Sequence, residues 1–218
     1  MPGLLPYRFL FRYALPVSYE GRLPGAGKKL LGLTETHRLP DLGRLDDTPG
    51  FAELRLAWNE RGLAVAVHVE GKQRALECDA KSPETSDGLQ LWIDTRNTHN
   101  IHRASRFCQA FSFLPKGGGA DKRSPVAAPL PIARAKEAPP AIDPQSLSIE
   151  CQTGPAGYHL AAWLPSEALH GYDPAAQPQL GFYYHVHDAE LGDQHLSVGP
   201  EFGCGYDPSL WGTLDLMK

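Results

Sequence analysis

Short segments in which apolar residues occupy every second position recur throughout this sequence of 218 residues. Successive side chains of a β-strand point to opposite faces, so a period of two predicts a strand with one buried face. Residues 88–94 show this clearly, because Leu89, Leu91 and Ile93 alternate with a second set that includes Gln90. The chain also contains 22 glycines and 20 prolines, which suit many short strands joined by turns and argue against a helical bundle.

The clearest hairpin is predicted from residues 51–58 and 63–70, two alternating segments that the turn-forming sequence NERG joins. Further strands are expected at 7–13, 88–94, 106–114, 146–152, 157–165, 181–188, 194–199 and 210–216. Roughly ten short strands and almost no helix predict an all-β fold, a two-sheet antiparallel β-sandwich of the jelly-roll kind.

The side chains that share one face of these strands are expected to form the core. They are Leu54, Leu56, Val65, Val67, Leu89, Leu91, Ile93, Phe111, Leu160, Phe182 and Leu214.

One segment interrupts the strand pattern. Residues 115–145 contain seven prolines and three consecutive glycines, and we expect one strand within them, near 132–135. The same pattern of strands resumes afterwards, so we interpret this segment as a long excursion within one domain that comprises residues 1–218. Residues 1–50 are expected to form an N-terminal strand and an extension.

The charge and hydropathy of the chain exclude several classes of partner. The net charge of −4 is spread along the sequence without a basic stripe, so no nucleic-acid partner is expected. No apolar run approaches the ~18 residues of a membrane span, so no membrane partner is expected. Arg8 and Arg12 interrupt the apolar N-terminal segment and no small-residue cleavage site follows. We therefore expect no signal peptide, and the cytoplasm is the default location.

The cysteines give no metal or redox motif, because no C-x-x-C occurs. Their even number permits disulfides without requiring them. They are Cys78, Cys108, Cys151 and Cys204.

Two histidines on one predicted strand resemble a pair of metal ligands. His185 and His187 are two residues apart and therefore point to the same side, so their imidazoles could share a metal ion. A metal site needs a third ligand, and the sequence does not indicate which residue would supply it. We therefore expect that these histidines share no catalytic metal and are outward residues that flank inward Tyr184 and Val186.

Polar side chains crowd into residues 94–106, directly after a predicted strand. Arg96, Asn100, His102 and Arg106 are not explained by turn chemistry, so this loop is either a ligand rim or a structural ion-pair network. Asp and Asn side chains with loop carbonyls also suit calcium, the one cofactor that the sequence suggests. No other cofactor is expected.

Five stretches occur in a fixed order: SDGLQLWIDTRN, CQAFSF, GYHLAAWLPSEAL, LGFYYHVHDAELG and DPSLWGTLDL. In this order they resemble the family-nine carbohydrate-binding modules and the wider DOMON-like sandwiches. The resemblance extends over residues 86–216 and more loosely back to the hairpin, so that the family-like core comprises about 51–216.

The resemblance implies a sugar held between two tryptophans, because the C–H faces of a pyranose are apolar and stack on aromatic rings. It places one ring at Glu84 and the other within residues 203–206, where Tyr206 is the remaining ring. It equates Gln90 with a carboxylate of the family and Gln109 with a hydrogen-bonding glutamine. The scaffold is thus expected to be retained and the two-ring clamp mostly lost.

These observations predict a non-catalytic, carbohydrate-binding-module-like domain. Two arginines in the loop favour an acidic sugar or a carboxylate as its ligand. The predicted ligand-binding residues are Gln90, Arg96, Asn100, His102, Arg106, Gln109 and Tyr206.

Two alternative functions remain open. One is an interaction domain that binds no sugar. The other is a glycoside-processing hydrolase, although no catalytic motif is found. Such a hydrolase would use Asp94 or Asp188 with His102 or His187.

Overall fold

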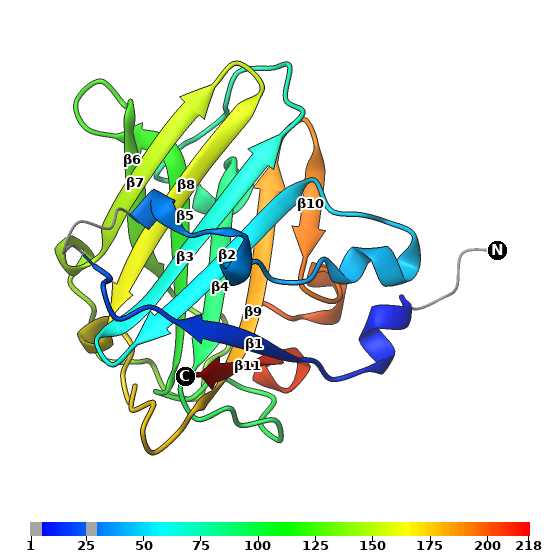
Figure 1. Ribbon diagram of the computed structural model, residues 1–218, viewed down its shortest axis with the longest axis vertical. Coiled ribbons are helices and arrows are strands. Elements are labelled where there is room, and N and C mark those ends of the chain that lie inside the picture. Colours follow the sequence, from blue (N-terminus) through cyan, green and yellow to red (C-terminus); the bar gives the residue numbers. More distant parts are fainter. Residues whose placement is uncertain (1–5, 25–29) are drawn as a thin grey trace.

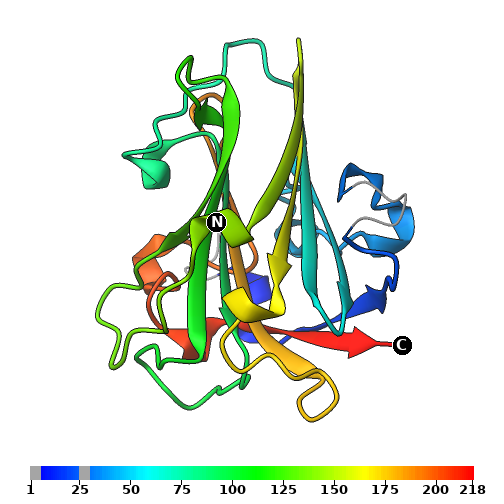
Figure 2. The same cartoon turned by 90° about the vertical axis from the view of Figure 1, so that its left-hand side faces the viewer.

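The alternating segments form strands of one curved sheet whose two ends face each other as layers (Figures 1 and 2). The computed structural model describes residues 6–24 and 30–218, so residues 1–5 and 25–29 of the N-terminal extension lie outside it. The strands are β1 (Ala14–Tyr19), β2 (Ala52–Asn59), β3 (Gly62–Glu70), β4 (Gly88–Asp94), β5 (Cys108–Gly118), β6 (Ser124–Leu130), β7 (Ser148–Gly154), β8 (Gly157–Pro165), β9 (Gln179–Asp188), β10 (Gly192–His195) and β11 (Gly212–Met217).

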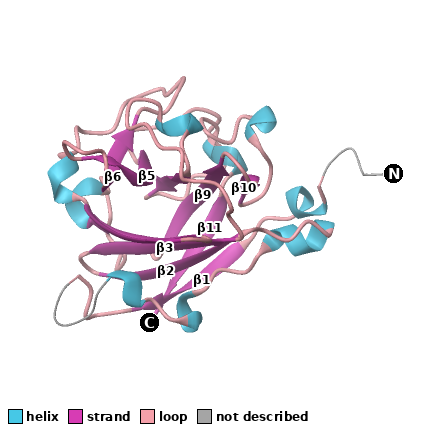
Figure 3. Ribbon diagram, turned by 90° about the horizontal axis from the view of Figure 1, so that it is seen from above, coloured by secondary structure: helices cyan, strands magenta, loops and turns pink. Residues whose placement is uncertain are grey.

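The helices are short 3-10 turns at the margins of the strands (Figure 3). They are η1 (Tyr7–Leu10), η2 (Leu30–Gly32), η3 (Glu35–His37), η4 (Leu42–Asp46), η5 (Pro83–Thr85), η6 (Pro144–Ser146), η7 (Ser166–Ala168), η8 (Pro200–Phe202) and η9 (Pro208–Leu210). No helix in 6–24 or 30–218 has the length and hydropathy needed to cross a membrane.

The strand order is β6-β5-β4-β9-β11-β1-β2-β3-β8-β7, with β10 paired to β9. The layer that contains β4 and β9 faces the layer that contains β3 and β8. The predicted all-β sandwich is confirmed, with one difference in detail. β1 runs parallel to both β11 and β2 and links the two layers, so the sheet is continuous and is not purely antiparallel.

The core lies between the layers, where every predicted core residue is buried in one hydrophobic cluster. Leu91 pairs with Phe111 on one side and with Tyr184 on the other, and all three side chains face inward. Burying a side chain of this size contributes about 1.5–3 kcal/mol relative to leaving it exposed.

The N-terminal strand begins later than the alternation predicts. Residues 7–10 form η1, and the pairing of β1 with β11 begins at Ala14 and Thr213. Within residues 7–13 only Tyr13 bonds to β11, where its carbonyl accepts from the amide of Thr213, and Tyr7 and Phe11 remain exposed. An aromatic alternation without a neighbour to pair with does not become a strand.

The Pro/Gly-rich segment carries its strand earlier than predicted. β5 continues to Gly118, and β6 pairs back onto it from Ser124 to Leu130. The expected strand at 132–135 is instead a turn in which the amide of Ala135 donates to the carbonyl of Ile132. β6 lies at the end of the strand order, and an edge strand tolerates prolines because one of its sides makes no ladder hydrogen bonds.

All four cysteines belong to the described residues and are unpaired. Burial raises the pKa of the Cys78 and Cys151 thiols to about 11 and that of the Cys108 and Cys204 thiols to about 12. The thiols are therefore protonated at neutral pH and are poor nucleophiles.

A buried ion-pair network joins the end of β9 to the segments that follow β3 and precede β4. The Lys72 ammonium lies 2.6 Å from Asp188 and 3.2 Å from Asp87, and both carboxylates are fully buried. Burial lowers the pKa of Lys72, but hydrogen bonds to Asp188 and Asp87 outweigh it and leave the pKa raised. Burial has the opposite effect on a carboxyl group and raises the pKa of Asp188. Hydrogen bonds from Lys72 and from two backbone amides outweigh burial and bring this pKa below its ordinary value.

Replacing Lys72 by methionine should destabilise the protein by about 3–5 kcal/mol, because two buried carboxylates lose their cation. The folded pKa of Asp188 is depressed, so its contribution to stability is present above roughly pH 4 and is lost as the pH falls through the folded pKa. The difference between Lys72→Met and the wild type should therefore shrink in acid. Urea unfolding at several pH values measures it.

The control is Lys81→Met, which removes the charge of an exposed lysine near η5. It should change the free energy of unfolding by less than about 0.5 kcal/mol. Equal effects of the two substitutions would show that the network does not stabilise the fold.

Candidate functional site

The outward side chains of β4, β9 and β10 form a continuous face because the strands are in register. Trp92 on β4 pairs with Tyr183 on β9, and Gln90 pairs with His185, which pairs in turn with His195 on β10. Residues directly opposite one another in antiparallel strands lie on the same side of the sheet. The residues between them, such as Leu91, point into the core.

A cavity of about 390 Å³ lies over this face. Trp92 and Tyr183 are largely buried, and their ring centroids lie 5.4 Å apart. The lining includes Glu84 from η5, Pro200 from η8 and Gly205. Gly205 lies close above Trp92, since a Cβ added to it would be 3.6 Å from the indole ring. The cavity therefore has an aromatic floor, and parts of η5 and residues 200–205 contribute to its lining.

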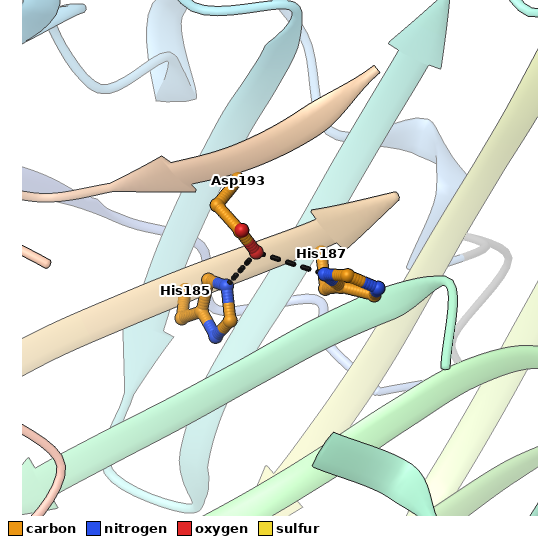
Figure 4. A group of neighbouring side chains, drawn as sticks. All are labelled: His185, His187 and Asp193. Carbon is orange, nitrogen blue, oxygen red and sulfur yellow. Dashed lines mark hydrogen bonds and ion pairs between the residues drawn. The ribbon is translucent and has the colours of Figure 1, made fainter. Parts of the chain in front are cut away.

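Three of the lining side chains hydrogen-bond to one another at the β9–β10 hairpin (Figure 4). One carboxylate oxygen of Asp193 lies 2.6 Å from Nε2 of His185 and 2.8 Å from Nδ1 of His187. The ring of His195 stacks on His185 at 4.3 Å between centroids. The Tyr183 hydroxyl lies 3.0 Å from Nδ1 of His195 and donates to the carbonyl of Val198.

The electrostatics of this cluster favour the neutral forms of His185 and His195 beside an ionised carboxylate. Burial lowers the pKa of His195 to about 4 and lowers that of His185 despite its hydrogen bond to Asp193. Burial raises the pKa of Asp193, but the hydrogen bonds to His187 and His185 outweigh it and leave the pKa below its ordinary value. A neutral imidazole offers one donor and one acceptor nitrogen, so this face can both donate and accept hydrogen bonds.

Comparison with solved structures identifies chains that share this fold. A family 9 carbohydrate-binding module from Caldicellulosiruptor kristjanssonii in complex with cellotriose matches 94% of this chain and 93% of its own, with a TM-score of 0.58 and 14% identity. A family 9 module from the same organism in complex with glucose matches 94% of this chain and 96% of its own. Its TM-score is 0.59 and its sequence identity is 13%. The fold is that of a family 9 carbohydrate-binding module. No protein-family model and no curated protein matches the sequence.

The cavity contains only one of the seven predicted site residues. Gln90 lines it, and its amide nitrogen donates to the carbonyl of Pro83 at 3.3 Å. Gln109 lies on β5 opposite Ile93 and points into the core, where its amide donates to the carbonyl of Arg106 and its side-chain oxygen has no partner among the described residues. Gln109 is therefore separated from the cavity by the sheet.

The loop at 94–106 is tied to two neighbouring segments. The Arg103 guanidinium donates to the carbonyls of Arg134 and Ala135 at 2.8 and 3.2 Å, and the Lys136 amide donates to the carbonyl of Ala104. The Arg134 guanidinium lies over the ring of Tyr206, 4.8 Å from its centroid. These contacts join the loop to residues 131–137 and, through them, to the segment before η9.

The four predicted residues of this loop are exposed and do not line the cavity. The Arg96 guanidinium lies 4.6 Å from the centroid of Phe107, Arg106 forms an ion pair with Glu137 at 3.6 Å, and His102 lies 3.2 Å from Asp207. Asn100 has no hydrogen bond or ion pair among the described residues. Three of these four side chains thus contact other protein groups, while ligand or calcium binding at this end stays a prediction.

The carboxylates that a hydrolase would use have structural partners. Asp94 accepts hydrogen bonds from the amides of Arg96 and Thr98 at 2.9 and 2.6 Å, which closes the turn after β4. Asp188 pairs with Lys72. Neither carboxylate lines the cavity.

Four residues that line the cavity are not among the predicted site residues: Trp92, Tyr183, Asp193 and His195. The alternation that puts Leu91 inward already puts Trp92 beside Gln90. Asp193 and His195 follow a tight turn after β9, so that their pairing with the two histidines depends on the length of that turn. A hairpin prediction across residues 188–192 would have found them.

Arg103→Ala should lower the stability of the protein by about 1–2 kcal/mol, because two carbonyls lose a charged donor at a partly solvated position. Asn100→Ala in the same loop should be nearly neutral. Thermal unfolding of both variants measures the difference. A neutral Arg103→Ala would show that these hydrogen bonds do not hold the loop.

Proposed function

We propose that this protein is a non-catalytic carbohydrate-binding module whose ligand occupies the cavity over β4 and β9. One observation carries the proposal. The cavity is lined by both Glu84 and Gly205, and the family resemblance places the sugar between these two segments. Similar folds hold cellotriose and glucose in family 9 modules, so gluco-configured sugars are the first ligands to test.

The lining of the cavity suits a pyranose. The rings of Trp92 and Tyr183 give an apolar floor against which C–H groups can pack. Gln90, His185 and His187 lie beside that floor and can donate to and accept from hydroxyl groups. Mostly apolar walls with a few polar groups are typical of small-molecule sites.

The ring clamp of the family is replaced here. Glu84 and Gly205 present no aromatic ring at the two clamp positions, and Tyr206 lies beneath Arg134. The stacked imidazoles of His185 and His195 add flat polar surface instead. We therefore expect affinity weaker than that of a two-ring clamp.

The carboxylates support a binding role over hydrolysis. Hydrolysis needs an acid and a second carboxylate free to act on the sugar. Asp193 is held by two imidazoles, and Asp94 and Asp188 bind backbone amides and Lys72. Glu84 is the remaining carboxylate of the lining.

Gln90→Ala should weaken saccharide binding at least about tenfold, which corresponds to about 1.4 kcal/mol, because a polar group beside the cavity floor is lost. Isothermal titration calorimetry with glucose, cellotriose and a panel of neutral and acidic oligosaccharides measures this. Gln152→Ala makes the same change on exposed β7 in the other layer and should have no effect.

Arg96→Ala and Asn100→Ala distinguish this cavity from the loop site. Both variants should retain binding if the ligand lies over β4 and β9. Loss of binding in these variants together with normal binding by Gln90→Ala would place the ligand at the loop. A wild-type protein that binds no member of the panel would favour an interaction domain that does not recognise sugars.

Glu84→Trp should raise the affinity for cellotriose severalfold, because Glu84 is exposed at the edge of the cavity and a ring there can stack on the sugar. Glu84→Leu removes the charge and adds no ring, so it should leave the affinity near that of the wild type. Both affinities are measured by the same titration. Equal affinities of the two variants would contradict a sugar positioned against η5.

A further inference from the structure

The strongest cluster of metal-ligand side chains in the described structure lies on the β9–β10 hairpin. We propose that His185, His187 and Asp193 bind one divalent transition-metal ion of the zinc type. This site goes beyond saccharide binding and does not depend on it. The sequence supported the opposite expectation for one reason, the lack of a third ligand, and the fold supplies that ligand as Asp193.

The backbone brings the three ligands together. His185 and His187 are neighbours on one face of β9, and Asp193 pairs directly with His187 across the hairpin. One ligand atom from each of the three residues lies within 4.8 Å of the others. Nε2 of His185 and Nδ1 of His187 are the nitrogens nearest the Asp193 carboxylate oxygen. In Figure 4 the carboxylate lies between the two imidazole rings, and each ring turns a nitrogen towards it.

The present spacing is close to that of a coordinated ion. Zinc ligands at about 2.0–2.1 Å in a tetrahedron lie roughly 3.4 Å from one another. The two hydrogen-bonded separations are 2.6 and 2.8 Å, so they must open by roughly 0.8 and 0.6 Å to reach that spacing. All three residues lie on paired strands, so we expect this change to come from rotation of their side chains and not from movement of the backbone.

The ligand types select the ion. Two imidazoles and one carboxylate form the three-ligand set of an open zinc site, and imidazole also suits copper and nickel. Calcium and magnesium require six or more oxygen ligands and are disfavoured. The side chains of His185 and His187 are only 15% and 24% exposed, which limits competition by water.

The surroundings position the ligands and leave one side open. The ring of His195 stacks on His185 and fixes the plane of its imidazole. Nδ1 of His195 is itself hydrogen-bonded to Tyr183, so this histidine supports the site from outside the ligand set. All three ligands line the cavity, and a fourth position on the ion therefore faces the space where water or a small ligand can enter.

The test uses untagged protein from which metal has been removed with EDTA. Isothermal titration calorimetry measures the binding of Zn²⁺, and a parallel titration with Co²⁺ as a substitute ion is monitored by visible absorption. The wild type should bind one Zn²⁺ per chain with micromolar or tighter affinity, and Co²⁺ should show the intense bands of a low-coordinate site. His187→Ala and Asp193→Asn should each weaken binding at least tenfold. Ca²⁺ should not compete for the site.

The matched control is His68→Ala, which removes a histidine from β3 in the other layer, beside His159. It should bind Zn²⁺ as the wild type does. Circular dichroism of each metal-free variant verifies that it is folded. Wild type without stoichiometric Zn²⁺ binding, or His187→Ala with unchanged binding, would overturn the proposal and leave Asp193 as a hydrogen-bond acceptor alone.

Saccharide titrations of the metal-free protein keep the two proposals separate. Zinc binding without saccharide binding supports the metal site and contradicts the proposed function. Saccharide binding without zinc binding supports the proposed function and contradicts the metal site.

Discussion

The fold and the candidate site both depend on the register between β4 and β9. Paired strands alternate their side chains together, so Leu91 and Tyr184 enter the core while Gln90 and His185 gather on the opposite face. A slip of one residue would exchange the two sets and bury the polar side chains. The free energy gained by burying the core therefore also fixes the positions of the cavity residues.

The face formed in this way is covered and held by short segments outside the sheet. The Tyr183 hydroxyl donates to Val198, and the Trp211 indole donates to the carbonyl of Cys204 at 2.6 Å, so residues 198–204 are fastened beside the aromatic floor. Lys72 fastens the opposite end of β9 through Asp188. A cavity between elements tied in this way is largely formed before a ligand arrives, which reduces the ordering cost of binding.

Much of this arrangement could be predicted from the sequence, because alternation at a period of two reports directly which residues share a face. It places Leu91 in the core and His185 outside it. Alternation alone does not show whether a partner strand exists, so the strand predicted at residues 7–13 is wrong. It also does not show where distant loops meet, so the contacts of Arg103 with residue 134 and of Arg106 with Glu137 are not visible in the sequence, and ligand binding by this loop stays a prediction. Asp193 is not identified from the sequence because only the hairpin brings it to the histidines.

We propose that the outward face of β4, β9 and β10 binds the ligand. The most direct measurement is a two-dimensional ¹H–¹⁵N NMR titration of labelled protein with cellotriose. We expect the shifts to concentrate on the Trp92 indole, the Gln90 side-chain amide and the backbone of β9 near His185. Shifts confined to residues 94–106, or no shifts with any saccharide, would contradict it.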